Sequence, residues 1–311
     1  KAVHGKVQHF LPYTRPLHPG YALHAEPGAI TDDTYIKNDF AAYILAHPNE
    51  EDRTPQALAG WLLKNAHFEW WWPPAVNVLR QFEAGEPFEK TRTILMGGGA
   101  AWWTPFGLVH AGDPDSAFKE TERHAVIWRL PFEQKLIAAT QAAVAASVVD
   151  GATVESVSDT LMRFSGPLAR QLLSRARRIA ENNAGDLEGF VTKIYAECLV
   201  KECSGDLDGP MPAPAVASDP YRGATVLWAE QIPLAYAAFI FGKGHFMDTL
   251  LSCASLGRDT DSICSTCGSW IGGLVGLQGI PADWVNALQT VNNKEMDLLA
   301  IANRMADAAG A

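Results

Sequence analysis

Apolar residues recur at helical spacing along most of the chain and rarely alternate as they do in a strand. The first such run starts at Thr34 and ends before Pro48, and Ile36, Phe40 and Ile44 lie on one face of it. The same spacing predicts helices over residues 55–66, 75–82, 115–129, 132–149, 153–163, 167–183, 187–200, 224–241, 245–255, 260–277, 281–289 and 294–308. Because no run of alternating β-branched residues is bounded by turns, the sequence predicts an all-α protein.

The segments without helical spacing do not divide the chain. Residues 1–30 are rich in His, Pro and Gly, and residues 205–220 are rich in Pro, Asp and Gly, so both are expected to be loops. No internal repeat of fixed period is present, and no shift in composition marks a boundary. We therefore expect a single domain over residues 1–311.

The charge balance excludes two classes of partner. The 311 residues include 25 Lys and Arg against 35 Asp and Glu, which gives a formal net charge of −10. A nucleic-acid groove or an anionic lipid surface would need a basic face, so neither is expected. No apolar run approaches the roughly 20 residues of a membrane-spanning helix, and no export signal is visible. With five scattered cysteines, these features favour a soluble cytoplasmic protein.

Two short acidic motifs each stand directly before a predicted helix. The sequence TDDT occupies positions 31–34, and GRDTDS occupies positions 257–262, ahead of the glycine-containing helix over 260–277. Asp, Ser and Thr side chains commonly cap helix N-termini, where the helix dipole also favours acids. Capping is therefore one explanation of each motif.

A cation site is the other explanation. Each motif holds two carboxylates together with hydroxyls, more than one cap can use, and adjacent carboxylates repel unless a cation compensates. Carboxylate and hydroxyl oxygens are hard ligands that suit Mg²⁺, Mn²⁺ or Ca²⁺. If the two helix starts face each other, Asp32, Asp33, Asp259 and Asp261 form one site for one or two divalent ions.

A terpene synthase that ionises its substrate is an alternative all-α enzyme with an aspartate-rich Mg²⁺ motif. Asp32-Asp33 followed by Asn38-Asp39 fits that pattern. The second acidic motif does not resemble the Asn/Ser/Glu metal motif of those enzymes, and the first motif lies at the beginning of the chain. This alternative is therefore disfavoured.

The motifs together resemble those of the ADP-ribosylglycohydrolase family. Residues 27–34 (PGAITDDT) are similar to its first metal motif, and residues 257–262 (GRDTDS), with the glycine-rich stretch that follows, are similar to its second. Residues 97–101 (GGGAA), followed by Pro105 and Gly107, resemble its central substrate loop. The order and the rough spacing agree over most of the chain.

This resemblance implies a single-domain orthogonal helical bundle with a binuclear metal cleft. It implies two Mg²⁺ ions, or Mn²⁺ in their place, held by Thr31, Asp32, Asp33, Asp259, Asp261 and Ser262. Such metals would hold the ribose hydroxyls and a water that hydrolyses the glycosidic bond at the anomeric carbon. Asp33 and Asp261 are the implied catalytic residues, as acceptors of the proton of that water. The implied substrate is a ribosyl or ADP-ribose-like small molecule or a modified protein.

Several positions depart from the family pattern. The family normally begins with a helix that carries a Glu for catalysis or substrate positioning, and we expect that helix to be absent or upstream of residue 1. Arg258 stands where Gly is usual, and Ser262 replaces Thr. In the central loop, Gly98 stands where Asn is frequent, and Trp102-Trp103 replaces Met-Arg. A catalytically altered homologue, acting as a metal-dependent ligand-binding or structural protein, is therefore the alternative function.

Tryptophans form two clusters, at positions 70–72 and 102–103. Consecutive aromatic residues cannot all face one core, so at least one indole per cluster is expected to be partly exposed and able to stack on a sugar or nucleobase. The alternative is that both clusters pack helix junctions. With the loop glycines that the resemblance identifies, the candidate substrate-binding residues are Gly97, Gly98, Gly99, Trp102 and Trp103.

Overall fold

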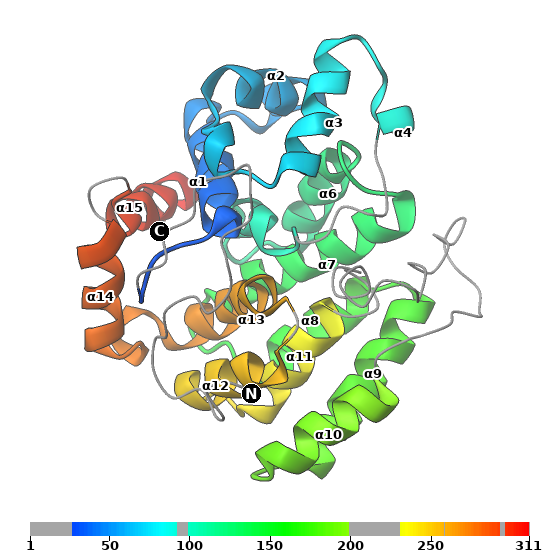
Figure 1. The fold of residues 1–311 in the computed structure, drawn as a ribbon, viewed down its shortest axis with the longest axis vertical. Coiled ribbons are helices and arrows are strands. Elements are labelled where there is room, and N and C mark those ends of the chain that lie inside the picture. The colour runs from blue at the N-terminus through cyan, green and yellow to red at the C-terminus, as the bar shows by residue number, and fades with distance from the viewer. Residues whose placement is uncertain (1–26, 92–98, 199–230, 258, 293–295, 311) are drawn as a thin grey trace.

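The computed structural model describes residues 27–91, 99–198, 231–257, 259–292 and 296–310 (Figure 1). Over these ranges the chain forms α-helices joined by turns and short 3-10 helices, and no strand occurs in them. The all-α prediction is confirmed.

The helices alternate with short connections along the chain. The α-helices are α1 (Asp32–Ala46), α2 (Pro55–Asn65), α3 (Pro73–Glu83), α4 (Phe88–Thr91), α5 (Thr104–Leu108), α6 (Pro114–Ala125), α7 (Pro131–Ser147), α8 (Val154–Phe164), α9 (Pro167–Asn182), α10 (Leu187–Glu197), α11 (Ile232–Phe241), α12 (Phe246–Leu256), α13 (Thr260–Val275), α14 (Ala282–Asn292) and α15 (Leu298–Ala309). The 3-10 helices are η1 (Glu50–Asp52), η2 (Phe68–Trp70), η3 (Ala101–Trp103) and η6 (Leu277–Gly279).

Proline marks many of the helix starts. A proline occupies the first or second position of α2, α3, α5, α6, α7, α9 and α11. Its fixed φ suits a first helical turn, where its missing N–H leaves no bond unmade. The sequence therefore indicates where these helices begin. Pro131 also explains why residues 126–130 lie outside the helix that was predicted to reach residue 129.

Other differences from the predicted helices are small. Helix α1 begins at Asp32, two residues before Thr34, so both acids of the first motif lie in its first turn. Helices α4 and α5 were not predicted, because elements of four or five residues are too short to show a period. Of the predicted helix over 224–241, the part before residue 231 lies outside the described residues, as do the predicted loops over 1–26 and 205–220.

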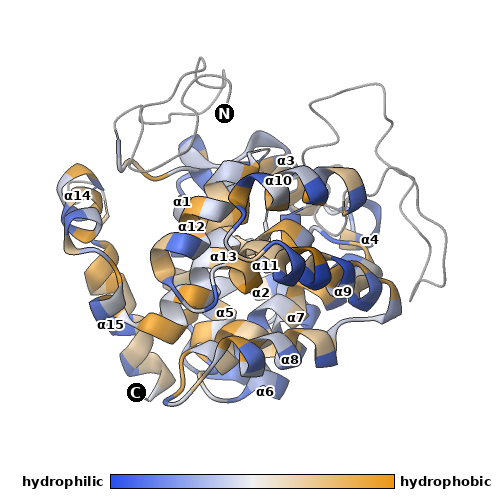
Figure 2. Cartoon of the chain, turned by 90° about the horizontal axis from the view of Figure 1, so that it is seen from below, coloured by the Kyte–Doolittle hydropathy of each residue, from blue (hydrophilic) through white to orange (hydrophobic). Residues whose placement is uncertain are grey.

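The core is built around α7 and α11. Helix α7 packs against α5, α6, α8 and α13, and α11 packs against α9, α12 and α13. Residues Ile232 to Ile240 of α11 are all buried, whereas α9 alternates polar outer positions with an apolar inner face (Figure 2). In the described ranges no helix combines the length and the apolar character needed to cross a bilayer.

Helix α13 lies close to α7 and to the start of α1. A Cβ added at Gly273 would lie 2.1 Å from Ser147 Oγ, so the glycine lets α13 approach the end of α7. Helix α1 packs against α13, and η3 contacts both of them. The starts of the two helices that follow the acidic motifs are therefore held in one region of the fold.

Candidate metal centre

The first acidic motif forms the start of α1. Thr31 stands at the N-cap position, and its carbonyl accepts hydrogen bonds from the backbone N–H groups of Thr34 and Tyr35. Asp33 is buried, with 3% of its surface exposed, while Thr31 and Asp32 are half-buried. The segment before the motif is held by Asn292 of α14, which accepts a hydrogen bond from Ile30 N and donates one to the carbonyl of Gly28.

The second acidic motif forms the start of α13. Asp259 occupies the N-cap position and is half-buried, Asp261 is exposed, and Ser262 is buried. Arg258, which the family pattern made notable, lies outside the described residues. The carbonyl of Asp259 accepts the first helical hydrogen bond, from Ile263 N at 3.1 Å.

The structure brings the two motifs together. Ser262 Oγ donates a hydrogen bond to Asp33 Oδ2 at 2.6 Å, across 229 positions of sequence. The charges of Asp33, Asp261 and Asp259 all act on Asp32, so the four carboxylates share one neighbourhood. The condition left open by the sequence, that the two helix starts face each other, is therefore met by the geometry.

Neither motif acts as a side-chain cap. The side chains of Thr31 and Asp259 accept no capping hydrogen bond from a backbone N–H in the first turn of their helices. By contrast, a side-chain oxygen caps the N-termini of five other helices, from Thr54, Asp113, Thr153, Asp186 and Asp297. Capping, which the sequence left open, therefore does not explain the side chains of the two acidic motifs.

The electrostatics of this cluster fit a divalent cation. Burial, and then the charges of neighbouring aspartates, raise the pKa of Asp32 to about 9 and that of Asp259 to about 8. Burial and the charge of Asp261 raise the pKa of Asp33 to about 6, against hydrogen bonds from Ser262 and Trp102. Carboxylates that resist ionisation because they are buried and repel one another are stabilised by a bound cation. The donor set consists of hard oxygens, as Mg²⁺ and Mn²⁺ prefer.

Two polar side chains beside the aspartates were not found by sequence reasoning. Gln231, just before α11, donates from Nε2 to Asp259 Oδ2 at 2.5 Å. Lys37 donates from Nζ to Ser265 Oγ at 2.8 Å, and its charge acts on Asp33. Lys37 was accessible to sequence reasoning, because it follows Asp33 by four residues and so shares its face of α1. Gln231 offered no such signal.

The central loop is described only from Gly99 onward, and Gly97 and Gly98 lie outside the described residues. Gly99 has a φ of +100°, and a Cβ added there would lie 2.5 Å from Arg129 Nη2. A glycine is therefore needed at this position, both for the backbone conformation and for the close approach of the buried guanidinium.

The tryptophans after this loop are buried. Trp102 and Trp103 each expose 1% of their surface, so the expectation of a partly exposed indole is wrong for this pair. Trp103 packs against Phe40, Phe106 and Trp128, whereas Trp102 Nε1 donates to Asp33 Oδ1 at 2.5 Å. In the cluster at 70–72, Trp71 is buried and its two neighbours are half-buried. A role of Trp102 and Trp103 in substrate binding stays a prediction.

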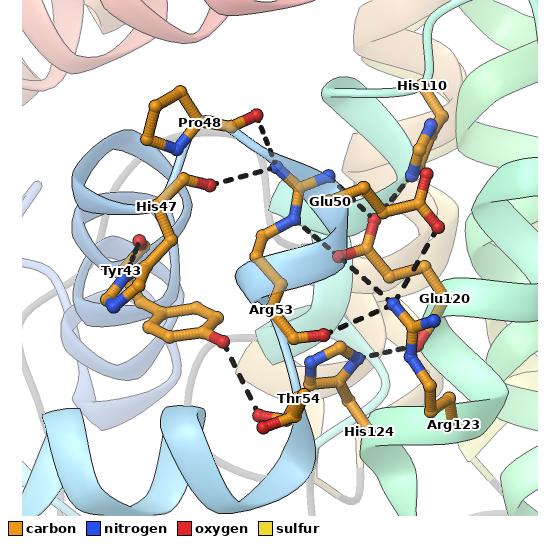
Figure 3. Close-up of polar contacts among 10 residues, drawn as sticks. All are labelled: Tyr43, His47, Pro48, Glu50, Arg53, Thr54, His110, Glu120, Arg123 and His124. Carbon is orange, nitrogen blue, oxygen red and sulfur yellow. Dashed lines mark hydrogen bonds and ion pairs between the residues drawn. The ribbon is translucent and has the colours of Figure 1, made fainter.

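A second group of possible metal ligands consists of Glu50 of η1, His110 and Glu120 of α6. Atoms of Glu50, His110 and Glu120 lie within 4.8 Å of one another (Figure 3). However, Arg53 binds both oxygens of Glu120, at 2.6 and 3.0 Å, and His110 Nε2 lies 2.5 Å from Oε2.

The charges in this second group oppose a metal. Burial raises the pKa of Glu120, but the hydrogen bonds from His110 and Arg53 outweigh it and hold the pKa below its usual range. Arg123 adds another cation, 3.7 Å from Glu50. Because guanidinium groups already neutralise Glu120, the aspartate centre is the better site for a divalent ion.

Comparison with known proteins agrees with the geometry. A family model described as ADP-ribosylglycohydrolase matches residues 2–311, nearly the whole chain. Comparison with curated proteins finds no match.

Proposed function

The chain belongs to the ADP-ribosylglycohydrolase family, and from that premise we propose that it is a divalent-metal-dependent hydrolase of a ribosyl glycosidic bond. The family is metal-dependent and acts on glycosidic bonds. The observation that carries the proposal is the contact between the two acidic motifs. Ser262 donates a hydrogen bond to Asp33 there, and the charges of the neighbouring aspartates raise the pKa values of Asp32 and Asp259.

The proposed metal ligands are the side chains of the two motifs. They are Thr31, Asp32, Asp33, Asp259, Asp261 and Ser262, and the proposed cofactor is two Mg²⁺ ions, with Mn²⁺ able to replace them. When bound, such ions orient a ribose diol and lower the pKa of a water. Ser262 Oγ keeps lone pairs for a cation while its hydroxyl donates a hydrogen bond to Asp33.

Asp261 and Asp33 have different proposed roles in the hydrolysis. Asp261 is exposed, so an attacking water can reach its carboxylate, and we assign to an oxygen of this carboxylate the role of accepting the proton of that water. Both oxygens of Asp33 already accept hydrogen bonds, from Trp102 and from Ser262, which suits Asp33 to holding a fixed position. The oxygen of the water bonds to the anomeric carbon, and the bond from that carbon to the aglycone breaks. The electron pair of the broken bond leaves with the aglycone, which then takes up a proton.

The proposed substrate class rests on the family. We assign a ribosyl or ADP-ribose-like small molecule, or an ADP-ribosylated protein, and we retain Gly97, Gly98 and Gly99 as candidate substrate-binding residues. We further propose that residues 1–311 form one domain and that the protein acts in the cytoplasm.

A hydrolysis screen tests this function. The purified protein is incubated with ADP-ribosylated peptides, nucleosides and simple ribosides. Each reaction contains either millimolar Mg²⁺ or Mn²⁺, or EDTA, and its products are separated by chromatography. The proposal expects release of the aglycone that EDTA abolishes and that Asp261→Asn strongly reduces. The matched control is Asp283→Asn, at an exposed acid in the first turn of α14.

Two results would contradict the proposal. Hydrolysis that persists in EDTA would remove the metal from the mechanism. Metal binding without hydrolysis of any ribosyl substrate would instead favour the alternative of a non-catalytic, metal-dependent binding protein.

A further inference from the structure

We propose that Trp102 is a positioning residue of the metal centre, which fixes the carboxylate of Asp33 through its indole N–H. The inference rests on the proposed function, because it assigns to Asp33 the role of a metal ligand.

The first observation is the way in which both oxygens of Asp33 are held. Trp102 Nε1 lies 2.5 Å from Oδ1, and Ser262 Oγ lies 2.6 Å from Oδ2. Asp33 as a whole is 3% exposed, so water does not compete freely for these positions. Each oxygen still has a second lone pair for a cation. The carboxylate plane is therefore set before any ion arrives.

The two donors differ in what they can do. A serine hydroxyl rotates and can donate or accept, whereas an indole N–H only donates and stays protonated. Trp102 therefore fixes Oδ1 as an acceptor of its N–H, and it is the partner that cannot change its role.

The indole itself has little freedom to move. Trp102 is 1% exposed and contacts two other indoles, Trp71 with ring centroids 6.4 Å apart and Trp128 with centroids 6.3 Å apart in an edge-to-face arrangement. Trp128 is anchored in turn by a hydrogen bond from Nε1 to the carbonyl of Ala75 at 3.1 Å. Side chains locked by packing hold a metal ligand more accurately than flexible ones do.

A second tryptophan of the same aromatic cluster donates a comparable hydrogen bond to another acid of α1. Trp71 Nε1 donates to Asp39 Oδ2 at 2.6 Å, and Asp39 lies on α1 six residues after Asp33. Asp39 also accepts from His67 and belongs to neither acidic motif. Trp71 and Trp102 thus attach two acids of α1 to one aromatic cluster, but only Trp102 reaches a proposed metal ligand.

The experiment compares Trp102→Phe with Trp71→Phe by titration of the metal-free protein with Mn²⁺ in a calorimeter. Each variant loses an indole donor to an acid of α1 and leaves a similar gap in the same cluster. We expect Trp102→Phe to weaken Mn²⁺ binding roughly 10- to 100-fold, the range found when a partner of a metal ligand is removed. Trp71→Phe is expected to change it less than about threefold. Equal effects of the two variants would overturn the inference.

A second measurement needs no metal and no folded Trp102 variant. The indole N–H groups of the ¹⁵N-labelled protein are observed by NMR, with the resonance of Trp71 as an internal comparison. The inference expects the Trp102 N–H to be shifted downfield and protected from exchange, and to move upfield in Asp33→Ala while the Trp71 N–H stays in place. A Trp102 resonance that Asp33→Ala leaves unmoved would refute the positioning role.

The two measurements separate the inference from the function on which it rests. Failure of the unaltered protein to bind Mn²⁺ would remove the metal centre, and with it the assignment of Trp102 to that centre. Normal Mn²⁺ binding by the unaltered protein and by Trp102→Phe would retain the metal centre and reject the role of Trp102 alone.

Discussion

Ser262 Oγ, at the start of α13, donates a 2.6 Å hydrogen bond to Asp33 Oδ2, at the start of α1. This bond joins two helix starts whose side chains do not cap their own helices. The carboxylates gathered there keep a pKa above the ordinary value of an aspartate. Such an arrangement is costly without a cation and stable with one.

The stability of the metal-free protein should fall as the pH rises from 6.5 to 8. Asp32 and Asp259, with pKa values of about 9 and about 8, hold protons in the folded state that they release in the unfolded chain, where the pKa is near 3.8. Each such proton lowers the free energy of unfolding by up to ~1.4 kcal/mol per pH unit. Thermal melting at pH 6.5, 7.2 and 8 in EDTA measures this dependence.

Mg²⁺ should reverse that pH dependence. Metal binding needs ionised carboxylates, so its stabilising effect grows as the pH rises. In Asp32→Asn the loss of stability with pH in EDTA should be smaller, because one repelling carboxylate has been removed. Asp283→Asn on α14 serves as the control and should melt like the unaltered protein. A metal-free protein that gains stability from pH 6.5 to 8 would contradict the close approach of these carboxylates.

Glu120→Gln should unfold far more easily than the unaltered protein while its Mn²⁺ affinity stays the same. The change leaves Arg53, 3% exposed, with an uncompensated buried charge, at a cost of about 3–5 kcal/mol in the free energy of unfolding by urea. Arg163→Gln breaks the exposed ion pair with Asp115 and should cost less than about 1 kcal/mol. If Glu120→Gln instead removes Mn²⁺ binding, the metal lies at Glu50, His110 and Glu120 rather than at the aspartates.

Two glycines on one helix should respond in opposite ways to alanine. A Cβ at Gly273 would lie 3.1 Å from the backbone carbon of Ser147 and far inside contact distance of its side chain, so Gly273→Ala should destabilise the fold by about 1–3 kcal/mol. A Cβ at Gly272 meets no heavy atom within 4 Å, so Gly272→Ala should stabilise α13 by up to ~1 kcal/mol. Urea unfolding of both variants gives the comparison, and equal shifts would refute the close approach of α13 to α7.

The helices were largely predictable because their signals are local. Proline starts such as Pro55 and Pro167, and apolar residues four apart such as Ile36 and Phe40, mark a helix without reference to the rest of the chain. The acidic motifs were predictable for the same reason, since each concentrates its carboxylates in a few residues. Their meeting was not, because it depends on how α1 and α13 pack.

The aromatic residues show the limit of local reasoning most clearly. The sequence indicates that the side chains of consecutive tryptophans cannot all face one core. In the structure both are buried: Trp103 packs against Phe40, and Trp102 directs its Nε1 toward Asp33. Exposure was the expected outcome because a hydrogen-bond partner 69 positions away has no trace in the sequence around Trp102. Gln231 and Asp259 were missed as a pair for the same reason.

The most direct test of the metal centre is a calorimetric titration of the metal-free protein with Mn²⁺. The unaltered protein and Asp283→Asn should bind Mn²⁺ alike. Asp33→Asn and Asp259→Asn, which each remove a carboxylate from one of the two motifs, should lose measurable binding. Unchanged Mn²⁺ binding in both of these variants would show that the two acidic motifs do not form one metal centre.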